Sequence, residues 1–216
     1  MRLIDAIKIT GNPFWIPDAV RTDLPQLMVD LGFERGAEIG VGSGQNLKLY
    51  CEVGLDMYGI DPWEDDEDYK HRPPTINPVP ESYSKDQAGM YRYAQKVLAP
   101  YTNCTLIRKT SIDAARDFPD RSLDFVYIDA NYSFGPIAMD LMAWIDKIRK
   151  DGIIAGSRYY TTIGDYRNIR HVKFIVDAFI KTYEINKWYV IGRPDEEREE
   201  NERCDPYFSW FGVKPW

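Results

Sequence analysis

The chain has 216 residues and a formal net charge of −7, with 44% hydrophobic and 28% charged residues. This length and mixture are typical of one globular domain with a full hydrophobic core. The acidic balance argues against the overall positive charge of a nucleic-acid-binding protein, and three widely spaced cysteines argue against a disulfide framework or a cysteine zinc site. Neither a signal peptide nor a run of ~20 apolar residues for a membrane span is present, so we expect a soluble, cytoplasmic protein with no membrane partner.

The predicted elements alternate between helices and strands. Residues 1–17 are predicted to be an irregular lead-in and residues 18–216 a single domain. A first helix is expected from Pro17 to Phe33, with Asp18 as its cap and Gly32 as its stop. Further helices are expected within residues 46–54, 84–101, 136–148 and 168–183. Strands are expected within residues 36–41, 56–61, 104–111, 123–130, 153–156, 187–193 and 207–215.

The order of these elements predicts the sheet. A strand, a glycine turn, a helix and a second strand follow one another over residues 36–61, which indicates a parallel crossover unit. The last two strands have no helix between them and are expected to be antiparallel. The sequence therefore predicts an α/β fold with a doubly wound, Rossmann-like seven-stranded sheet, mostly parallel, with an antiparallel C-terminal hairpin.

A long loop is expected over residues 63–80, which carry five acids and four prolines. A loop of this length inside a compact domain is usually either functional, in which case this one could fold over the pocket as a lid, or disordered. It contains His71, for which a base role is the less favoured interpretation. The other histidine, His171, is in a predicted helix and is expected to be structural.

Three glycines follow the first strand in the pattern Gly40-x-Gly42-x-Gly44. The sixth position from Gly40 is Gln45, so the pattern is not the dinucleotide fingerprint, and this disfavours a nicotinamide-dependent oxidoreductase. A turn at a helix N-terminus binds an anion, which is a phosphate or an amino-acid carboxylate. Asp61 ends the next strand, where an acid either accepts both hydroxyls of a ribose or caps its own turn.

Five stretches, "AEIGVGSGQN", "YGIDPW", "KTSIDAA", "DFVYIDANYSF" and "KDGIIAG", occur in this order. Together they resemble the class I S-adenosylmethionine-dependent methyltransferases, and more narrowly the bacterial small-molecule group that includes macrocin O-methyltransferase. The likeness covers about residues 18–215. It implies methyl transfer from S-adenosylmethionine to a small-molecule acceptor, at oxygen. Methylation of nucleic acid is disfavoured because there is no basic cluster and no Asn-Pro-Pro-Tyr type motif.

The resemblance also implies roles for individual residues. Glu38 and the three glycines would line the methionine part of the cofactor, and Asp61 would hold its ribose. The residues after the third strand match the positions that meet the adenine, although Ile112 could instead be a core residue. Trp63 either walls the adenine or anchors its loop. The expected cofactor-binding residues are Glu38, Gly40, Gly42, Gly44, Asp61, Trp63, Ser111, Ile112 and Asp129.

The chain departs from the family pattern at the reacting end. Asp129 would lie beside the sulfonium and the acceptor, but Tyr132 stands where related sequences typically have histidine. After the fifth strand, where related sequences typically read "GHDY" or "DDY", this chain has Gly156, Ser157, Arg158 and Tyr159, so that Arg158 replaces an acid. In the macrocin-like branch, acids at these strand ends hold a magnesium ion, and arginine is no magnesium ligand. We therefore predict no metal site, with Asp129, Tyr132 and Arg158 as the catalytic residues.

Three questions stay open: the role of Arg158, whether catalysis is retained, and how the C-terminal tail packs. Arg158 either supplies fixed positive charge, pairing with Asp129 or an anionic acceptor, or is an ordinary surface arginine. The same departures are compatible with a catalytically impaired protein that binds S-adenosylmethionine or S-adenosylhomocysteine. The aromatic tail over residues 207–216 could pack internally or form a homodimer contact.

Overall fold

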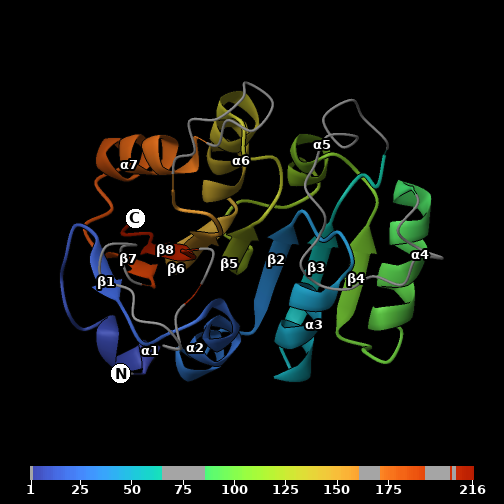
Figure 1. Cartoon of the computed structure of the whole chain (residues 1–216), viewed down its shortest axis with the longest axis horizontal. Coiled ribbons are helices and arrows are strands. Elements are labelled where there is room, and N and C mark those ends of the chain that lie inside the picture. The colour runs from blue at the N-terminus through green and yellow to red at the C-terminus, as the bar shows by residue number, and fades with distance from the viewer. Residues whose placement is uncertain (1, 65–85, 161–170, 193–204, 206–207) are drawn as a thin grey trace.

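The computed structural model describes residues 2–64, 86–160, 171–192, 205 and 208–216 (Figure 1). Its strands are β1 (Phe14–Ile16), β2 (Arg35–Ile39), β3 (Asp56–Ile60), β4 (Cys104–Ile107), β5 (Leu123–Ile128), β6 (Ile148–Gly156), β7 (Trp188–Ile191) and β8 (Trp210–Val213). Its helices are α1 (Leu3–Ala6), the 3₁₀ turn η1 (Arg21–Asp23), α2 (Leu24–Asp30), α3 (Gln45–Glu52), α4 (Gln87–Leu98), α5 (Ser111–Ala115), α6 (Phe134–Ile145) and α7 (Val172–Thr182).

One sheet contains all of these strands, in the order β1-β7-β8-β6-β5-β2-β3-β4. Strand β8 pairs antiparallel with both β6 and β7, and the other pairs are parallel. The predicted α/β fold and its antiparallel C-terminal hairpin are therefore confirmed. The strand count of seven is wrong, because β1 lies in the lead-in predicted to be irregular and pairs with the edge of β7.

The first predicted helix is shorter than expected and starts later. The chain forms η1 and then α2 from Leu24, so Asp18 is not its cap. Pro25 lies in the first turn of α2, where its missing N–H costs no hydrogen bond. The predicted stop is confirmed, since Gly32 follows α2 with a φ of 71°.

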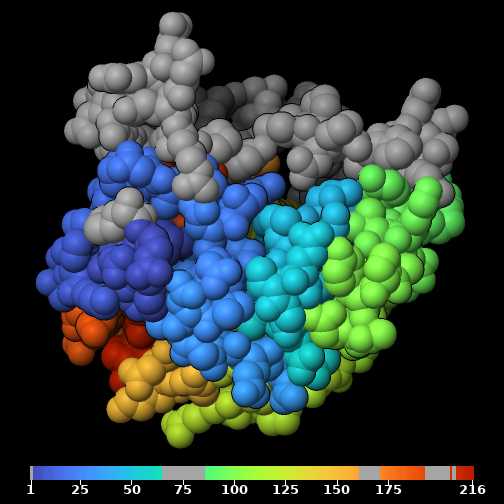
Figure 2. Space-filling view, turned by 90° about the horizontal axis from the view of Figure 1, so that it is seen from below, coloured from blue at the N-terminus to red at the C-terminus, as the bar shows by residue number. Residues whose placement is uncertain are grey.

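Helices cover both faces of the sheet (Figure 1). Helices α5, α6 and α7 pack on one face, over a core that contains Leu141, Trp144 and Val176. Helices α1 to α4 lie side by side on the other face, which Figure 2 shows, over a second core that contains Leu27 and Tyr50. Burying apolar side chains on both faces favours the parallel arrangement of the central strands.

The chain order reverses at the centre of the sheet. Strand β2 pairs with β3 on one side and with β5 on the other. Ligands of doubly wound sheets bind at such a point, outside the carboxyl ends of the strands. The glycine turn after β2 and Asp129 after β5 both lie at this place.

Several expectations concern segments at the margin of the described residues. Residues 65–80 of the predicted lid loop, with His71, lie outside them. Within the described part of the tail, Trp210 and Phe211 are buried and Trp216 stacks on Tyr183, so these residues pack internally. Among the described residues, no helix is long and apolar enough to cross a membrane.

Candidate active site

The glycine turn bends tightly between β2 and α3, with positive φ angles of 88° at Gly40, 53° at Gly42 and 80° at Gly44. A Cβ atom added at Gly40 would lie 2.4 Å from the carbonyl oxygen of Asp129, so only glycine fits there. A Cβ atom at Gly42 would meet no atom of the described residues within 4 Å. The turn is thus packed against the sheet at Gly40 and open at Gly42.

Asp61, after β3, braces this turn. Its carboxylate accepts hydrogen bonds from the backbone N–H of Gly42 at 2.9 Å and of Trp63 at 2.8 Å. The indole N–H of Trp63 donates to the carbonyl of Gly42 at 2.9 Å, and its ring packs on Tyr91 at 4.7 Å between centroids. Trp63 is buried and anchors its loop to the glycine turn. Asp61 therefore caps its own turn in this arrangement.

Glu38 is buried at the end of β2 with half of its carboxyl group satisfied. Its Oε1 accepts a hydrogen bond from the side-chain amide of Asn46 at 3.1 Å, whereas its Oε2 has no hydrogen-bond partner among the residues that the structure describes. Burial, reinforced by the nearby Asp129, raises the pKa of Glu38 well above its usual range. A buried oxygen without a partner is costly, so this position favours a ligand that supplies a hydrogen-bond donor.

The two residues predicted near the adenine lie at the start of α5. The hydroxyl of Ser111 accepts a hydrogen bond from the indole N–H of Trp144 at 2.9 Å. Ile112 is half-buried and belongs to neither core cluster formed by the described residues, so it is placed at a surface rather than in the interior. Asp140 on α6 is buried, and this burial raises its pKa to about 6 although Ser111 hydrogen-bonds to it.

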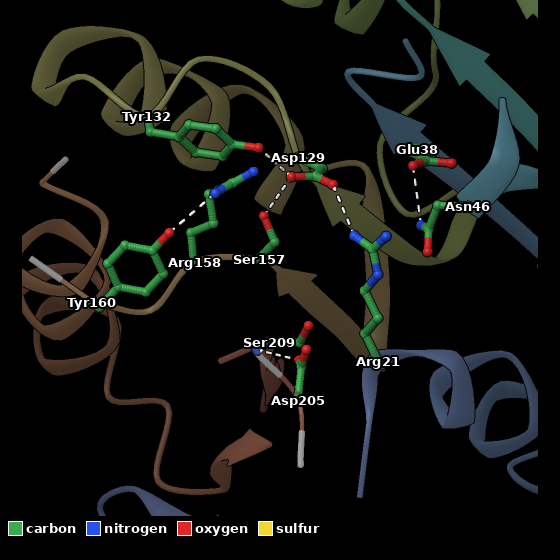
Figure 3. A network of polar contacts seen from close by, with 10 residues as sticks. All are labelled: Arg21, Glu38, Asn46, Asp129, Tyr132, Ser157, Arg158, Tyr160, Asp205 and Ser209. Atoms are coloured by element: carbon green, nitrogen blue, oxygen red, sulfur yellow. Dashed lines mark hydrogen bonds and ion pairs between the residues drawn. The ribbon is translucent and has the colours of Figure 1, made fainter. Parts of the chain in front are cut away.

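Asp129 lies at the centre of a polar network at the carboxyl end of β5 (Figure 3). One of its carboxylate oxygens, Oδ1, accepts hydrogen bonds from the hydroxyls of Tyr132 and Ser157. The other, Oδ2, lies 3.6 Å from the guanidinium Nη1 of Arg21. Both oxygens are therefore engaged, by residues of three different segments.

Arg158 contacts Tyr132 and Tyr160. Its guanidinium sits 4.7 Å from the centroid of the Tyr132 ring, and its Nη1 donates to the hydroxyl of Tyr160 at 3.0 Å. Within the described residues, Arg21 forms an ion pair with Asp129, whereas Arg158 contacts the ring of Tyr132. Burial and the neighbouring Asp129 raise the pKa of Tyr132, so this phenol stays protonated at neutral pH.

The structure thus brings Glu38, the glycine turn, Asp61, Asp129, Tyr132 and Arg158 to one edge of the sheet. It adds three residues that the sequence analysis did not assign to the site: Arg21, Asn46 and Ser157. Asn46 lies two residues after Gly44, and Ser157 directly precedes the unusual Arg158, so both carried a weak signal. The residues that the structure describes contain no group of three or more His, Cys, Asp or Glu side chains that could hold a metal ion.

Comparison with known proteins gives one family and many structures. The family model described as "Methyltransferase domain" matches residues 34–157, from the start of β2 to Ser157. A search of curated proteins gives no match.

Three similar solved structures have different acceptors in their names. A tRNA (m1A58) methyltransferase from Aquifex aeolicus is 15% identical, with a TM-score of 0.58 over 99% of this chain and 76% of that chain. A SAM-dependent O-methyltransferase from Thermotoga maritima is 12% identical, with a TM-score of 0.56 over 93% and 68%. A 1,6-didemethyltoxoflavin-N1-methyltransferase from Burkholderia thailandensis, bound to S-adenosylhomocysteine, is 10% identical, with a TM-score of 0.53 over 88% and 76%. At these identities the likeness establishes the fold and leaves the acceptor open.

Proposed function

The chain belongs to the methyltransferase domain family, and we propose that this S-adenosylmethionine-dependent methyltransferase acts on a small-molecule acceptor, at an oxygen atom and without a bound metal ion. The cofactor supplies a sulfonium-activated methyl group, which an acceptor attacks in an in-line displacement. The protein's part in such a reaction is to bind, align and exclude water.

The observation that carries this proposal is the fit of the glycine turn to such a cofactor. Gly42 leaves open space above the turn, and the unpartnered Oε2 of Glu38 lies at the end of the adjoining strand. An ammonium group is the donor that this oxygen lacks, and the methionine part of the cofactor carries one. We assign Glu38 and the turn to the methionine part, Asp61 to the ribose, and Ser111 and Ile112 to the adenine. Trp63 is buried and donates to the carbonyl of Gly42, so we assign it the support of the turn rather than contact with the adenine.

Asp129 is the group that we assign to the acceptor. Its carboxylate is held by the hydroxyls of Tyr132 and Ser157 and by the guanidinium of Arg21. A carboxylate held in this way is a well-oriented hydrogen-bond acceptor, so we assign it the task of orienting the acceptor's hydroxyl group. Tyr132 donates a hydrogen bond to Asp129, and its ring makes a cation–π contact with Arg158.

The proposed absence of a metal rests on the donors around Asp129. A magnesium ion requires carboxylate or water oxygens that are free to face it. Here Oδ1 accepts two hydroxyl groups, and Oδ2 faces the Arg21 guanidinium. That positive charge repels a second cation at Oδ2, whereas the second lone pair of Oδ2 can still accept a hydrogen bond from a neutral hydroxyl group. Calorimetric titration with magnesium chloride tests this: we expect no stoichiometric binding, and tight one-to-one binding would contradict the metal-free site.

The acceptor class is tested by labelling. The purified protein is incubated with S-adenosylmethionine labelled at its methyl group, and with either small-molecule fractions of a cell extract or total RNA. The net charge of −7 disfavours a polyanionic acceptor, so we expect label in a small-molecule fraction and none in RNA. Label in RNA alone would contradict the proposed acceptor while leaving the methyltransferase activity intact.

A further inference from the structure

We propose that Arg21, which precedes the segment matched by the family model, is a positioning residue that holds the Asp129 carboxylate as the fixed anion of the site. This inference rests on the proposed function and assigns to it a residue from the N-terminal segment. Figure 3 shows Arg21 reaching from that segment to Asp129, on the side opposite Tyr132 and Ser157.

The turn that carries Arg21 is itself held in place. The backbone N–H of Val20 donates to the Asp23 carboxylate at 3.0 Å, and the N–H of Asp23 donates to the carbonyl of Val20 at 2.9 Å. These two bonds close η1 directly before α2, whose residues Leu24 and Leu27 are buried in the core. The start of the Arg21 side chain is therefore fixed relative to the sheet.

The end of the side chain lies in a mostly buried, acidic place. The side chain of Arg21 is 19% exposed and that of Asp129 17%. Glu38, Tyr127 and Asp205 are also electrostatic neighbours of Arg21. Asp129 faces Glu38 as well, so without Arg21 its carboxylate would meet acidic groups with less compensating positive charge.

Partners from four segments hold Asp129 in place. The hydroxyls of Tyr132 and Ser157 hold Oδ1, Arg21 faces Oδ2, and the backbone N–H of Asp129 donates to the carbonyl of Ile39 at 2.8 Å. Methyl transfer depends on alignment, and a small displacement of an orienting group lowers the rate strongly. Arg21 thereby acts on the reaction through Asp129, without itself needing to touch the acceptor.

The same strand offers a matched control. Asp124, near the start of β5, pairs with Arg149 at 2.5 Å and accepts the backbone N–H groups of Glu34 and Arg35. This pair lies at the opposite end of the strand from the glycine turn. Arg149→Met removes an arginine from an aspartate of β5 without disturbing the site.

The experiment measures Asp129 directly and then its effect on methyl transfer. Aspartate carboxyl carbons are labelled with ¹³C, and the Asp129 signal is identified by its loss in Asp129→Asn and compared at one pH in four proteins: wild type, Arg21→Met, Arg21→Lys and Arg149→Met. We expect Arg21→Met to shift and broaden the Asp129 signal, Arg21→Lys to restore most of its wild-type position, and Arg149→Met to leave it unchanged, because only Arg21→Met removes the positive charge that faces Oδ2. The same Asp129 signal in all four proteins would overturn the proposal.

Methyl transfer separates positioning from a merely structural ion pair. With the small-molecule fraction labelled by wild type, we expect Arg21→Met to lower the rate of methyl transfer at least tenfold and Arg21→Lys to restore most of it, while Arg149→Met keeps the wild-type rate. If wild type methylates the acceptor and Arg21→Met does so at the same rate, the role of Arg21 is contradicted and the proposed function is not. A wild-type protein that labels no acceptor would instead contradict the proposed function.

Discussion

Alanine substitutions at three glycines separate the cost of the glycine turn's shape from its binding role. Gly40, Gly42 and Gly54 all have positive φ angles, of 88°, 53° and 89°. Alanine in this region costs about 1 kcal/mol of unfolding free energy at each. At Gly54, which closes α3, a Cβ atom would lie within 4 Å of no atom in the described part of the chain, so Gly54→Ala measures that strain alone.

The other two positions differ in what the added methyl group meets. At Gly40 it would lie 2.4 Å from the carbonyl oxygen of Asp129, and this backbone contact must be relieved by moving β2 away from β5. We expect Gly40→Ala to lose about 3 kcal/mol or more, from overpacking added to strain. At Gly42 the methyl group would enter the open space assigned to the cofactor. Gly42→Ala should therefore lose only about 1 kcal/mol, as Gly54→Ala does, but bind the cofactor at least tenfold more weakly.

The assays are thermal unfolding and calorimetric titration with S-adenosylhomocysteine. A loss of about 1 kcal/mol lowers the melting temperature of a protein of this size by about 2–4 °C. We expect Gly42→Ala and Gly54→Ala to melt alike and to differ in binding, with Gly54→Ala at wild-type affinity. Wild-type affinity in Gly42→Ala would refute the assignment of the open side of the turn to the cofactor.

Three further predictions concern charge, packing and metal. Burial raises the pKa of Glu38, so its contribution to stability is present below about pH 4.5 and is lost as pH rises, by about 1.4 kcal/mol per pH unit up to its folded-state pKa. Glu38→Gln should therefore melt at a higher temperature than wild type at pH 8, with a smaller difference at pH 5, and should bind S-adenosylhomocysteine more weakly. Equal melting differences at both pH values would contradict a buried, neutral Glu38. The buried Lys214 donates to the carbonyls of Ile145 at 3.0 Å and Ile148 at 2.8 Å, so Lys214→Met should lose about 3 kcal/mol in urea unfolding with cofactor binding unchanged, and a loss under 1 kcal/mol would show that these carbonyls find other partners. Finally, EDTA should leave methyl transfer to the labelled small-molecule fraction unchanged, and activity that is abolished by EDTA and restored by magnesium would contradict the metal-free site.

The sequence allowed the central sheet to be predicted because its signals are local. Each central strand is a short apolar run between turn residues, and the glycine turn marks the end of the first of them. Strand β1 lacked such a signal, since Phe14–Ile16 is only three residues long and lies between Pro13 and Pro17. It exists because the edge of β7 offers backbone groups to pair with, and that contact joins distant parts of the chain.

The candidate site was predictable as far as motifs reach. The residues at the ends of β2, β3 and β5 follow recognisable patterns, and the structure places them together. Arg21 has no such pattern, because one arginine in a predicted helix is typical of a solvated face. Its contact with Asp129 depends on how the N-terminal segment folds back over the sheet, which no local pattern encodes.

The most direct test of the cofactor assignment is calorimetric titration of the purified protein with S-adenosylmethionine, S-adenosylhomocysteine and NAD. We expect one-to-one binding of the first two and none of NAD, because the glycine turn and Glu38 fit an amino-acid ligand and the dinucleotide fingerprint is missing. Binding of none of the three would contradict it, since the turn would then have the family's shape without the family's ligand.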